Sequence, residues 1–287
     1  MTIRRILVPL DGGDQSKAAL QAGLAVGQAL AAHVSALHVH HDAKDSIPLL
    51  GEGMSVAMIE DMIRIAETEA AERAAKARAL FDEATSQASI SISDQPSASG
   101  ASAAWSEESG REDDTTARRG RLADLIVAPR PTSDSAPSAT LTLNAALFET
   151  GRPVLVVPPD GATTIGRNIA ISWNGSAQAA RAIGSAIPLI AKAEQVTVFT
   201  IESERTSTGD TPDAAEYLAW HGIEAEAKAI TGSAGSVGAE LLSQATTAGA
   251  DLLVMGAYTH SRMRQLILGG VTRHVLDTAE IPLFMAH

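Results

Sequence analysis

The most informative part of this sequence is Asp251–Thr272, DLLVMGAYTHSRMRQLILGGVT. It begins with the apolar run Leu252–Met255, which has the length of a buried strand and ends at Gly256. The pair Gly269-Gly270 precedes VTRHVLDTA, whose apolar residues recur at helical spacing. A strand, a glycine-punctuated loop and a helix start can cradle phosphate, because free amides and the helix dipole attract anions. A basic surface loop that closes a βα unit is the alternative interpretation.

The charges in this region favour an anion site. Between Gly256 and Leu276 the sequence holds Arg262, Arg264 and Arg273, together with two histidines and no acidic residue. The chain as a whole carries a net charge of −12, so the basic interval stands out. The same net charge argues against general binding to nucleic acid or to anionic membranes, both of which need a basic footprint.

The loop resembles the signature Gly-x2-Gly-x9-Gly-Ser/Thr of the universal stress protein family, whose loop amides and hydroxyl hold ATP phosphates. Gly256 and Gly269 match the first and third glycines. Thr259 replaces the second glycine and adds a Cβ that disfavours positive φ. Gly270 replaces the hydroxyl residue but keeps its amide. The resemblance implies an adenine-nucleotide site formed by Gly256, Thr259, Arg262, Arg264, Gly269, Gly270 and Val271.

Composition narrows the class of protein. Hydrophobic residues make up 45% of the chain and charged residues 20%, which is typical of a globular protein. The absence of cysteine excludes disulfides, thiolate catalysis and cysteine metal sites. The first residues, MTIRRILVPLDGG, lead directly into a strand rather than a signal peptide, and no apolar run has the length of a membrane span. We therefore expect a cytoplasmic protein without a membrane partner.

The sequence repeats itself over half its length. Residues 3–10, followed by Asp11-Gly12-Gly13, correspond to residues 168–173, followed by Asn174-Gly175-Ser176. The clearest identity is Ala-Asp-Leu-Ile-Val at 123–127 against Ala-Asp-Leu-Leu-Val at 250–254. Such a repeat indicates two copies of one domain. We place the domains at 1–158 and 165–287, on either side of a proline- and glycine-rich linker at 158–162.

Strand-like and helix-like segments alternate along both halves, which predicts an α/β fold with a parallel sheet covered on both faces. We expect strands at 3–10, 33–40, 88–93, 122–128 and 154–157, and again at 168–173, 196–201, 225–230, 252–255 and 282–285. Residues 94–117 are expected to form a loop and a helix start. Ser16 is a candidate N-cap, and Pro188 is expected to interrupt its helix.

The family resemblance adds detail to this fold. It implies two tandem Rossmann-like domains, of the adenine-nucleotide alpha-hydrolase type, each with a five-stranded sheet. In the family the last strand pairs with that of a second copy. In a tandem chain this pairing can be internal and give a pseudo-dimer, and a further homodimer stays open.

The resemblance also implies how the adenosine is held, by an aspartate after the first strand and an apolar residue after the second. The first half keeps these as Asp11 and Val39, but Pro129 stands where the first glycine belongs and donates no amide. The second half has Asn174 and Ile201, and asparagine can still hydrogen-bond an adenine edge. We therefore expect the nucleotide in the second half and a degenerate secondary site in the first.

Other constellations predict no further chemistry. His38 and His40 fall on one side of a strand and His41 on the other, without carboxylates or cysteines at ligand spacing. We interpret them as a polar strand end and expect no metal site. No Gly-x-Ser-x-Gly elbow or nucleophile with an adjacent base is present. We expect no enzyme activity beyond slow, incidental ATP hydrolysis.

The sequence thus predicts a stress-response protein that binds or senses an adenine nucleotide (ATP, ADP or AMP) through its second half, with Mg²⁺ as a candidate companion ion. The alternative is a nucleotide-free protein of the same fold that acts by binding a protein partner.

Overall fold

The structure, a computed structural model, describes residues 2–40, 56–96, 100–202, 211–231, 236–258 and 270–287. The elements of the first half are β1 (Arg5–Pro9), α1 (Asp14–Leu30), β2 (His33–His40), α2 (Val56–Gln87), β3 (Ser91–Ile92), β4 (Ser102–Ser109), α3 (Glu112–Gly120), β5 (Leu125–Pro129), α4 (Pro137–Glu149) and β6 (Val154–Val157). Those of the second half are β7 (Asn168–Ser172), α5 (Ala177–Ile190), β8 (Gln195–Ile201), α6 (Thr211–Ala219), β9 (Glu226–Ile230), α7 (Val237–Thr247), β10 (Leu252–Gly256), α9 (Val271–Thr278) and β11 (Leu283–Ala286).

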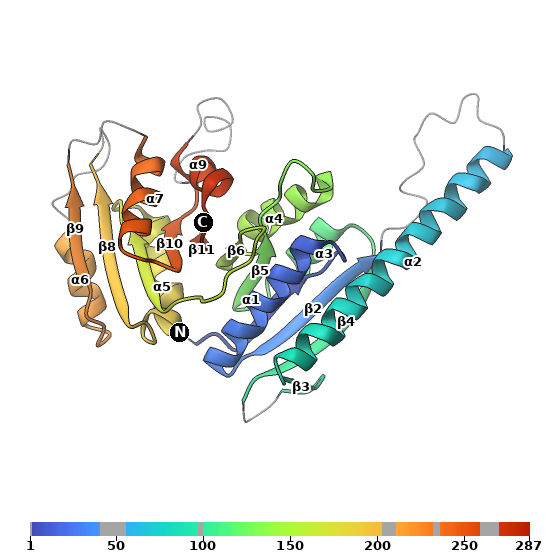
Figure 1. The fold of residues 1–287 in the computed structure, drawn as a ribbon, viewed down its shortest axis with the longest axis horizontal. Helices are drawn as coiled ribbons and strands as arrows, with labels where there is room; N and C mark the ends of the chain where they lie inside the picture. Colours follow the sequence, from blue (N-terminus) through green and yellow to red (C-terminus); the bar gives the residue numbers. More distant parts are fainter. Residues whose placement is uncertain (1, 41–55, 97–99, 203–210, 232–235, 259–269) are drawn as a thin grey trace.

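One eleven-stranded sheet runs through both halves, in the order β3-β4-β2-β1-β5-β6-β11-β10-β7-β8-β9, and Figure 1 shows the halves side by side along it. Neighbouring strands are parallel except at the seam, where β6 and β11 run antiparallel with Leu155 opposite Phe284. The predicted α/β fold with a mostly parallel sheet is confirmed, as is the internal pairing of the last strands. The second half has the five strands expected, whereas the first has a sixth, two-residue strand, β3, at its edge.

Both faces of the sheet are buried, as parallel sheets require. In β5, Leu125 and Val127 belong to one core cluster, and Ile126 and Ala128 belong to the other. Helices α1, α2, α5 and α6 contribute to the first cluster, and α4, α7 and α9 contribute to the second. Burial on both sides explains why these strands appear in the sequence as continuous apolar runs.

The two halves match strand by strand. Pro9 lies opposite Leu37 in the β1·β2 pair, as Ser172 lies opposite Phe199 in the β7·β8 pair. The β1·β5 and β7·β10 pairs correspond in the same way. These registers make Asp11 equivalent to Asn174, Val39 to Ile201, and Pro129 to Gly256, as the sequence repeat predicts.

The repeated Ala-Asp-Leu motif has a structural reason. The carboxylate of Asp124 accepts the backbone N–H groups of Arg4 and Arg5 at 2.9 and 3.0 Å. In the second half, the carboxylate of Asp251 accepts the backbone N–H groups of residues 166, 167 and 168 at 3.0, 3.1 and 3.0 Å. Each aspartate therefore satisfies backbone donors where the chain enters the first strand of its half.

The prediction for the third strand of the first half is wrong. Residues 102–109, expected to be a loop, form β4, while only Ser91–Ile92 of the expected strand at 88–93 pairs in the sheet. The serines and glutamates of β4 hide its strand pattern, because only its first two residues are buried.

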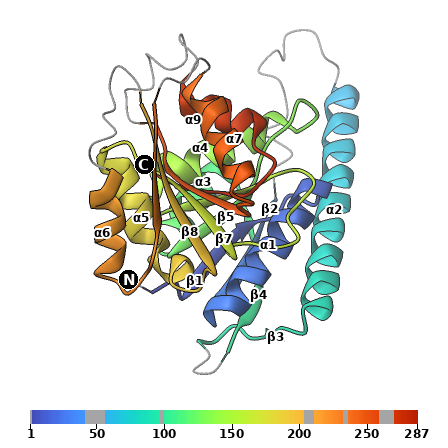
Figure 2. The same ribbon diagram turned by 60° about the vertical axis from the view of Figure 1, so that its left-hand side comes forward.

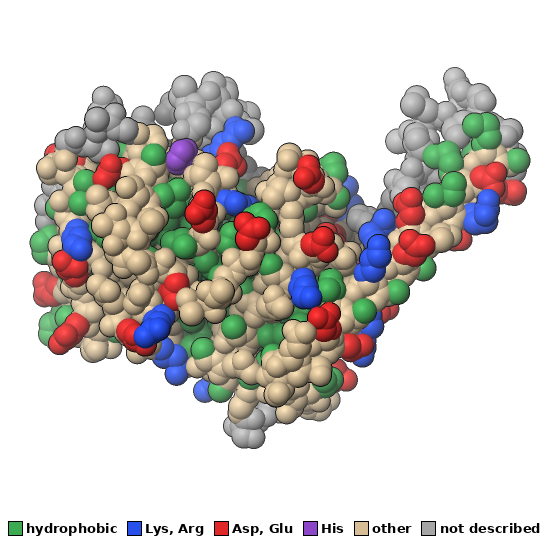
Figure 3. Space-filling model, in the orientation of Figure 1, with side chains coloured by type: hydrophobic (Ala, Val, Ile, Leu, Met, Phe, Trp, Pro, Cys, Tyr) green, Lys and Arg blue, Asp and Glu red, His purple; other side chains and the backbone are tan. Residues whose placement is uncertain are grey.

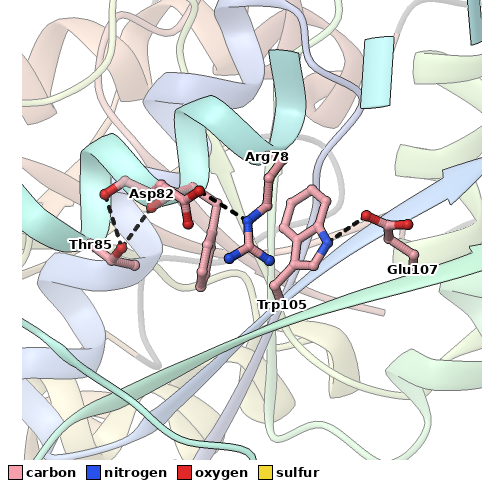
Figure 4. Close-up of polar contacts among 6 residues, drawn as sticks. Arg78, Asp82, Thr85, Trp105 and Glu107 are labelled. Carbon is pink, nitrogen blue, oxygen red and sulfur yellow. Dashed lines mark hydrogen bonds and ion pairs between the residues drawn. The ribbon is translucent and has the colours of Figure 1, made fainter. Parts of the chain in front are cut away.

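Helix α2 anchors β4 from outside. In Figure 4, the guanidinium of Arg78 faces the ring of Trp105, with its central carbon 5.6 Å from the ring centre. The indole N–H of Trp105 in turn donates to Glu107 at 2.8 Å. Aromatic and charged side chains therefore fix a strand whose own apolar surface is small.

Helix α2 extends beyond the body of the first half, as Figures 1 and 2 show. Its C-terminal part packs on the core through Ala77 and Phe81, both fully buried. None of residues 57–76 is buried, and Met58 and Ile65 are 55% and 53% exposed. Figure 3 shows hydrophobic side chains at this projecting end, among acidic and basic ones.

Two details of the helices also differ from expectation. The N-cap of α1 is Gly13 rather than Ser16, because the helix begins at Asp14 and Ser16 lies within its first turn, where its hydroxyl bonds to Asp11. Helix α5 continues through Pro188 and ends two residues later, at Ile190, so the missing N–H of the proline does not stop the helix at that point. No helix in the described part of the chain has the combined length and apolarity needed to cross a bilayer.

Candidate functional site

The carboxyl ends of β7, β8 and β10 form the edge on which the sequence places the nucleotide. Because these three strands are parallel neighbours, Asn174, Ile201 and Gly256 lie along one edge of the sheet. Ligands of open α/β sheets bind at this kind of edge. The remaining predicted loop residues Thr259, Arg262, Arg264 and Gly269 lie outside the described residues.

Helix α9 begins at the same edge. The hydroxyl of Thr272 accepts the backbone N–H of Tyr258 at 3.2 Å, which ties the start of α9 to the chain leaving β10. Gly270 is the N-cap, and no described side chain caps the first amides of the helix. Val271, the first helical residue, is 37% exposed. The start of α9 therefore presents backbone donors to an anion.

Asn174 is exposed and shapes the turn before α5. Its Oδ1 accepts the backbone N–H of Ser176 at 3.2 Å and the Ser176 hydroxyl at 2.7 Å. Ser176 in turn caps α5, since its Oγ accepts the N–H of Ala179 at 3.1 Å. The Nδ2 group of Asn174 donates no hydrogen bond within the described part of the chain. One end of this amide is therefore structural, and the other is available to a ligand.

Gly256 is required by packing. A Cβ on this residue would lie 2.6 Å from the backbone nitrogen of Ala179 and 2.8 Å from the carbonyl carbon of Gln178. The close approach of α5 to the end of β10 thus excludes any side chain here. Ile201 is also a core residue, only 5% exposed. The glycine spacing that predicts a phosphate loop therefore also serves helix packing at Gly256.

At the equivalent edge of the first half, the carboxylate of Asp11 accepts hydrogen bonds from neighbouring protein groups. Its Oδ1 accepts the backbone N–H of Gly13 at 2.8 Å and a hydrogen bond from the Ser16 hydroxyl. The Ser16 oxygen in turn accepts the N–H of Asp11 at 3.2 Å. Asp11 therefore closes a turn, while Val39, only 6% exposed, lies in the core.

The loop after β5 fills the position of a phosphate cradle in the first half. Its Thr132 N–H donates to Ser135 Oγ at 2.8 Å. Gln15 at the start of α1 donates to the Thr132 hydroxyl at 2.9 Å and accepts from Ser135 at 2.8 Å. Helix α4 then begins with Pro137, which has no N–H to offer. The sequence gives only a weak signal for this arrangement, in the abundance of Ser and Thr in the loop.

An acidic group also marks this edge. Glu112, the first residue of α3, has its pKa raised to about 7, chiefly by burial and then by the negative charge of Asp11. Sequence reasoning misses this residue because its neighbours Asp113 and Asp114 make it look like a solvated helix start. The negative charge of Asp11, which helps to raise this pKa, would also disfavour a phosphate at this edge.

The histidines of β2 are satisfied by protein groups. His38 is buried, with its Nδ1 2.7 Å from the carbonyl oxygen of Leu10, and burial lowers its pKa. His40 lies 3.0 Å from a carboxylate oxygen of Glu107. His41 lies outside the described residues, within which no group of three or more His, Asp or Glu side chains could hold a metal ion.

Comparison with known proteins places these observations in context. The model of the universal stress protein family matches residues 2–131 and 167–287. A solved universal stress protein from Archaeoglobus fulgidus is similar over 98% of this chain and 97% of its own, with a TM-score of 0.65 and 16% identity. No curated protein sequence matches the chain.

Two further solved structures are similar over part or all of the chain. A putative universal stress protein from Pseudomonas aeruginosa gives a TM-score of 0.52 at 16% identity, over 99% of this chain and 93% of its own. A universal stress protein in complex with cAMP gives a TM-score of 0.35 at 18% identity, over 55% of this chain and 98% of its own.

Proposed function

The chain belongs to the universal stress protein family, and we propose that it binds an adenine nucleotide at the carboxyl edge of its second half. The observation that supports this most is the start of α9. Its first amides have no side-chain cap among the described residues, and it shares an edge of the sheet with the exposed Asn174.

Each described residue of this edge has a definite role in the proposal. The phosphates accept hydrogen bonds from the amides of Val271 and Thr272, where the helix dipole favours negative charge. The free Nδ2 of Asn174 donates to a ring nitrogen of adenine. Arg262 and Arg264 remain predicted sources of positive charge, and Mg²⁺ remains a predicted companion of the phosphates. These groups supply binding, and we propose no catalytic step.

The first half is proposed not to bind nucleotide. Its loop is fastened to α1 by Gln15, Thr132 and Ser135, and Pro137 removes an amide from the start of α4. Asp11 adds negative charge nearby, as does Glu112 when it ionises with its raised pKa of about 7. The proposed stoichiometry is therefore one nucleotide per chain.

The direct test is to denature freshly purified protein and identify any released nucleotide by mass spectrometry, followed by titration of the emptied protein with ATP and Mg²⁺. Gly270→Asp is the decisive variant. Its carboxylate would cap α9 and repel phosphate, so it should weaken ATP binding at least about tenfold while preserving the fold.

Ala136→Asp is the matched control. Ala136 is the N-cap of α4, the equivalent helix of the first half, and it also lacks a side-chain cap. We expect unchanged ATP affinity in this variant. Equal affinity in wild type and Gly270→Asp would contradict the proposed site.

A nucleotide-free interaction protein is the second candidate function. It is favoured by Gly256 and Asn174, which packing and turn formation explain in part without any ligand. The projecting end of α2, with Met58 and Ile65 more than half exposed, offers a surface for a protein partner. Absence of ATP binding at millimolar concentration in the wild-type protein would favour this function. The cytoplasmic location expected from the sequence stays a prediction under both.

A further inference from the structure

A cavity of about 620 Å³ lies between α4 of the first half and α9 of the second. In Figure 1 these helices flank the seam at which β6 meets β11. The volume is within the range of roughly 300–1,000 Å³ that is typical of small-molecule sites. Because the two halves contribute opposite walls, this site exists only when both are present.

One wall of the cavity is apolar and partly aromatic. The rings of Phe148 and Tyr258 lie with their centres 5.0 Å apart and their planes tilted by 53°. Leu276 from α9 and Leu141 from α4 add aliphatic surface, and Leu141 is 48% exposed. Apolar side chains that remain exposed inside a cavity gain free energy when a ligand covers them.

Arg130 provides a cationic group in the same cavity. Its Nη1 donates to the carbonyl oxygens of Ala279 at 2.6 Å and Leu276 at 3.2 Å, at the C-terminal end of α9. These bonds fix one side of the guanidinium. Within the described residues, its Nε and Nη2 donate no hydrogen bond, and no carboxylate lies within ion-pair distance of Arg130. The half-buried guanidinium therefore has two unused donors in a fixed position.

The other charges that line the cavity are paired or exposed. Asp113 forms an ion pair with Arg111 at 2.6 Å, and Asp277 forms one with Arg273 at 3.6 Å. Glu149 is exposed at the end of α4. The lining thus leaves Arg130 as its basic group without an acidic partner among the described residues, and this favours an anionic ligand over a cationic one.

We propose that this cavity binds a small amphipathic carboxylate. The two carboxylate oxygens accept hydrogen bonds from Nε and Nη2 of Arg130, in the fork geometry that guanidinium groups favour. The apolar part of the ligand covers Leu141, Leu276 and the Phe148–Tyr258 pair. The cavity is lined by Arg273, Leu276 and Asp277 of α9, whereas the nucleotide is proposed to bind the amides of Val271 and Thr272, which are not among the lining residues. The two sites are therefore neighbours that use different groups, and each proposal can hold without the other.

Decanoate is a suitable probe for calorimetric titration of the full chain, with decanamide and decylammonium as neutral and cationic counterparts. We expect decanoate to bind at least about tenfold more tightly than decanamide, because a charge-assisted pair contributes more than a neutral hydrogen bond. Decylammonium should bind more weakly still. Tighter binding of decylammonium, or no binding of decanoate at millimolar concentration, would overturn the proposal.

Arg130→Gln should lower decanoate affinity at least about tenfold. Arg152→Gln is the matched control, since Arg152 also donates to a helix-terminal carbonyl, that of Arg121 after α3, but does not line the cavity. It should leave decanoate affinity unchanged. Equal affinities in the two variants would overturn the role of Arg130.

A second variant covers the case in which loss of Arg130 unfolds the protein. Asn144→Trp introduces a large ring from an exposed position of α4 that lines the cavity. It should abolish decanoate binding while the circular dichroism spectrum and ATP titration stay as in wild type. Retained decanoate binding in this variant would place the ligand elsewhere and overturn the proposal.

Discussion

At the carboxyl edge of the first half, Gln15 joins the loop after β5 to the start of α1 through Thr132 and Ser135. At the equivalent edge of the second half, α9 starts at Gly270 without a described side-chain cap. The strands beneath these edges share one register and topology. The start of α4 also lacks a side-chain cap, but its first residue, Pro137, has no N–H, whereas α9 begins with Val271 and keeps this amide. The difference teaches that a repeated fold can be kept while the loops at its carboxyl edges diverge.

What the halves share lies at the opposite ends of their strands. Asp124 and Asp251 satisfy the same part of the backbone in each copy, far from the carboxyl edge. Neither aspartate has a role in the proposed binding. Identity between the halves is therefore greatest where it serves folding, and the two copies differ most where ligands would bind.

The largest expected effect comes from Gly256→Val. The new side chain would meet the backbone of Ala179 and Gln178, so we expect a loss of about 3 kcal/mol in the free energy of unfolding, measured by urea denaturation. Pro129→Val, at the equivalent position, should cost less than about 1 kcal/mol. Equal costs would show that the packing difference between the halves has no energetic consequence.

The next largest effect is the pH dependence of stability that we expect from Glu112, the first residue of α3. In the second half, the equivalent helix α7 begins with the apolar residue Val237. A folded pKa of about 7, above the unfolded value, means that the protonated carboxyl stabilises the fold at low pH. This stabilisation is complete below about pH 4.5 and is lost as the pH rises through 7, by at most about 3 kcal/mol.

Glu112→Gln tests this dependence, because glutamine stays neutral at every pH. The variant should match wild type near pH 4 and exceed its free energy of unfolding at pH 8. Urea denaturation across this range measures the difference. The contrary outcome is a free energy of unfolding that changes in parallel for wild type and variant between pH 5 and pH 8. Glu112 would then not have a raised pKa, and it would not distinguish the two edges.

The smallest expected effect is the difference in stability between variants of the two equivalent aspartates, Asp251 and Asp124. Asp251 accepts three backbone N–H groups and Asp124 accepts two. We expect Asp251→Asn to cost about 2 kcal/mol and Asp124→Asn about 1 kcal/mol, since each loses charge-assisted hydrogen bonds. Thermal or urea denaturation of both variants gives the order. A larger loss in Asp124→Asn would mean that the first half depends more on this contact.

The sequence predicts the strands that are buried on both faces, such as β5, because a short continuous apolar run between turn residues is typical of such strands. It does not predict β4, where serine and glutamate side chains mask the alternation and Arg78 and Trp105 supply the anchoring from elsewhere. Distant contacts of this kind leave no local pattern.

The candidate site is predictable only in outline. Glycine spacing brings out Gly256 and Gly270, the family resemblance and the repeat bring out Asn174, and all three lie at the carboxyl edge of the second-half sheet. The packing reason for Gly256 depends on how closely α5 approaches β10, which no local pattern reveals. The contacts of Gln15 with a loop 117 residues away are hidden for the same reason.

The antiparallel pairing of β6 with β11 within one chain has a consequence for how the two halves can diverge in sequence during evolution. Two separate subunits joined at this edge would have identical sequences, so any substitution would appear on both sides of the seam. In the tandem chain, β6 and β11 have different sequences and always pair with each other. Because the linker sets their effective concentration, this pairing persists at any dilution. Asymmetry between the halves is therefore heritable, and one can lose a ligand site without affecting the other.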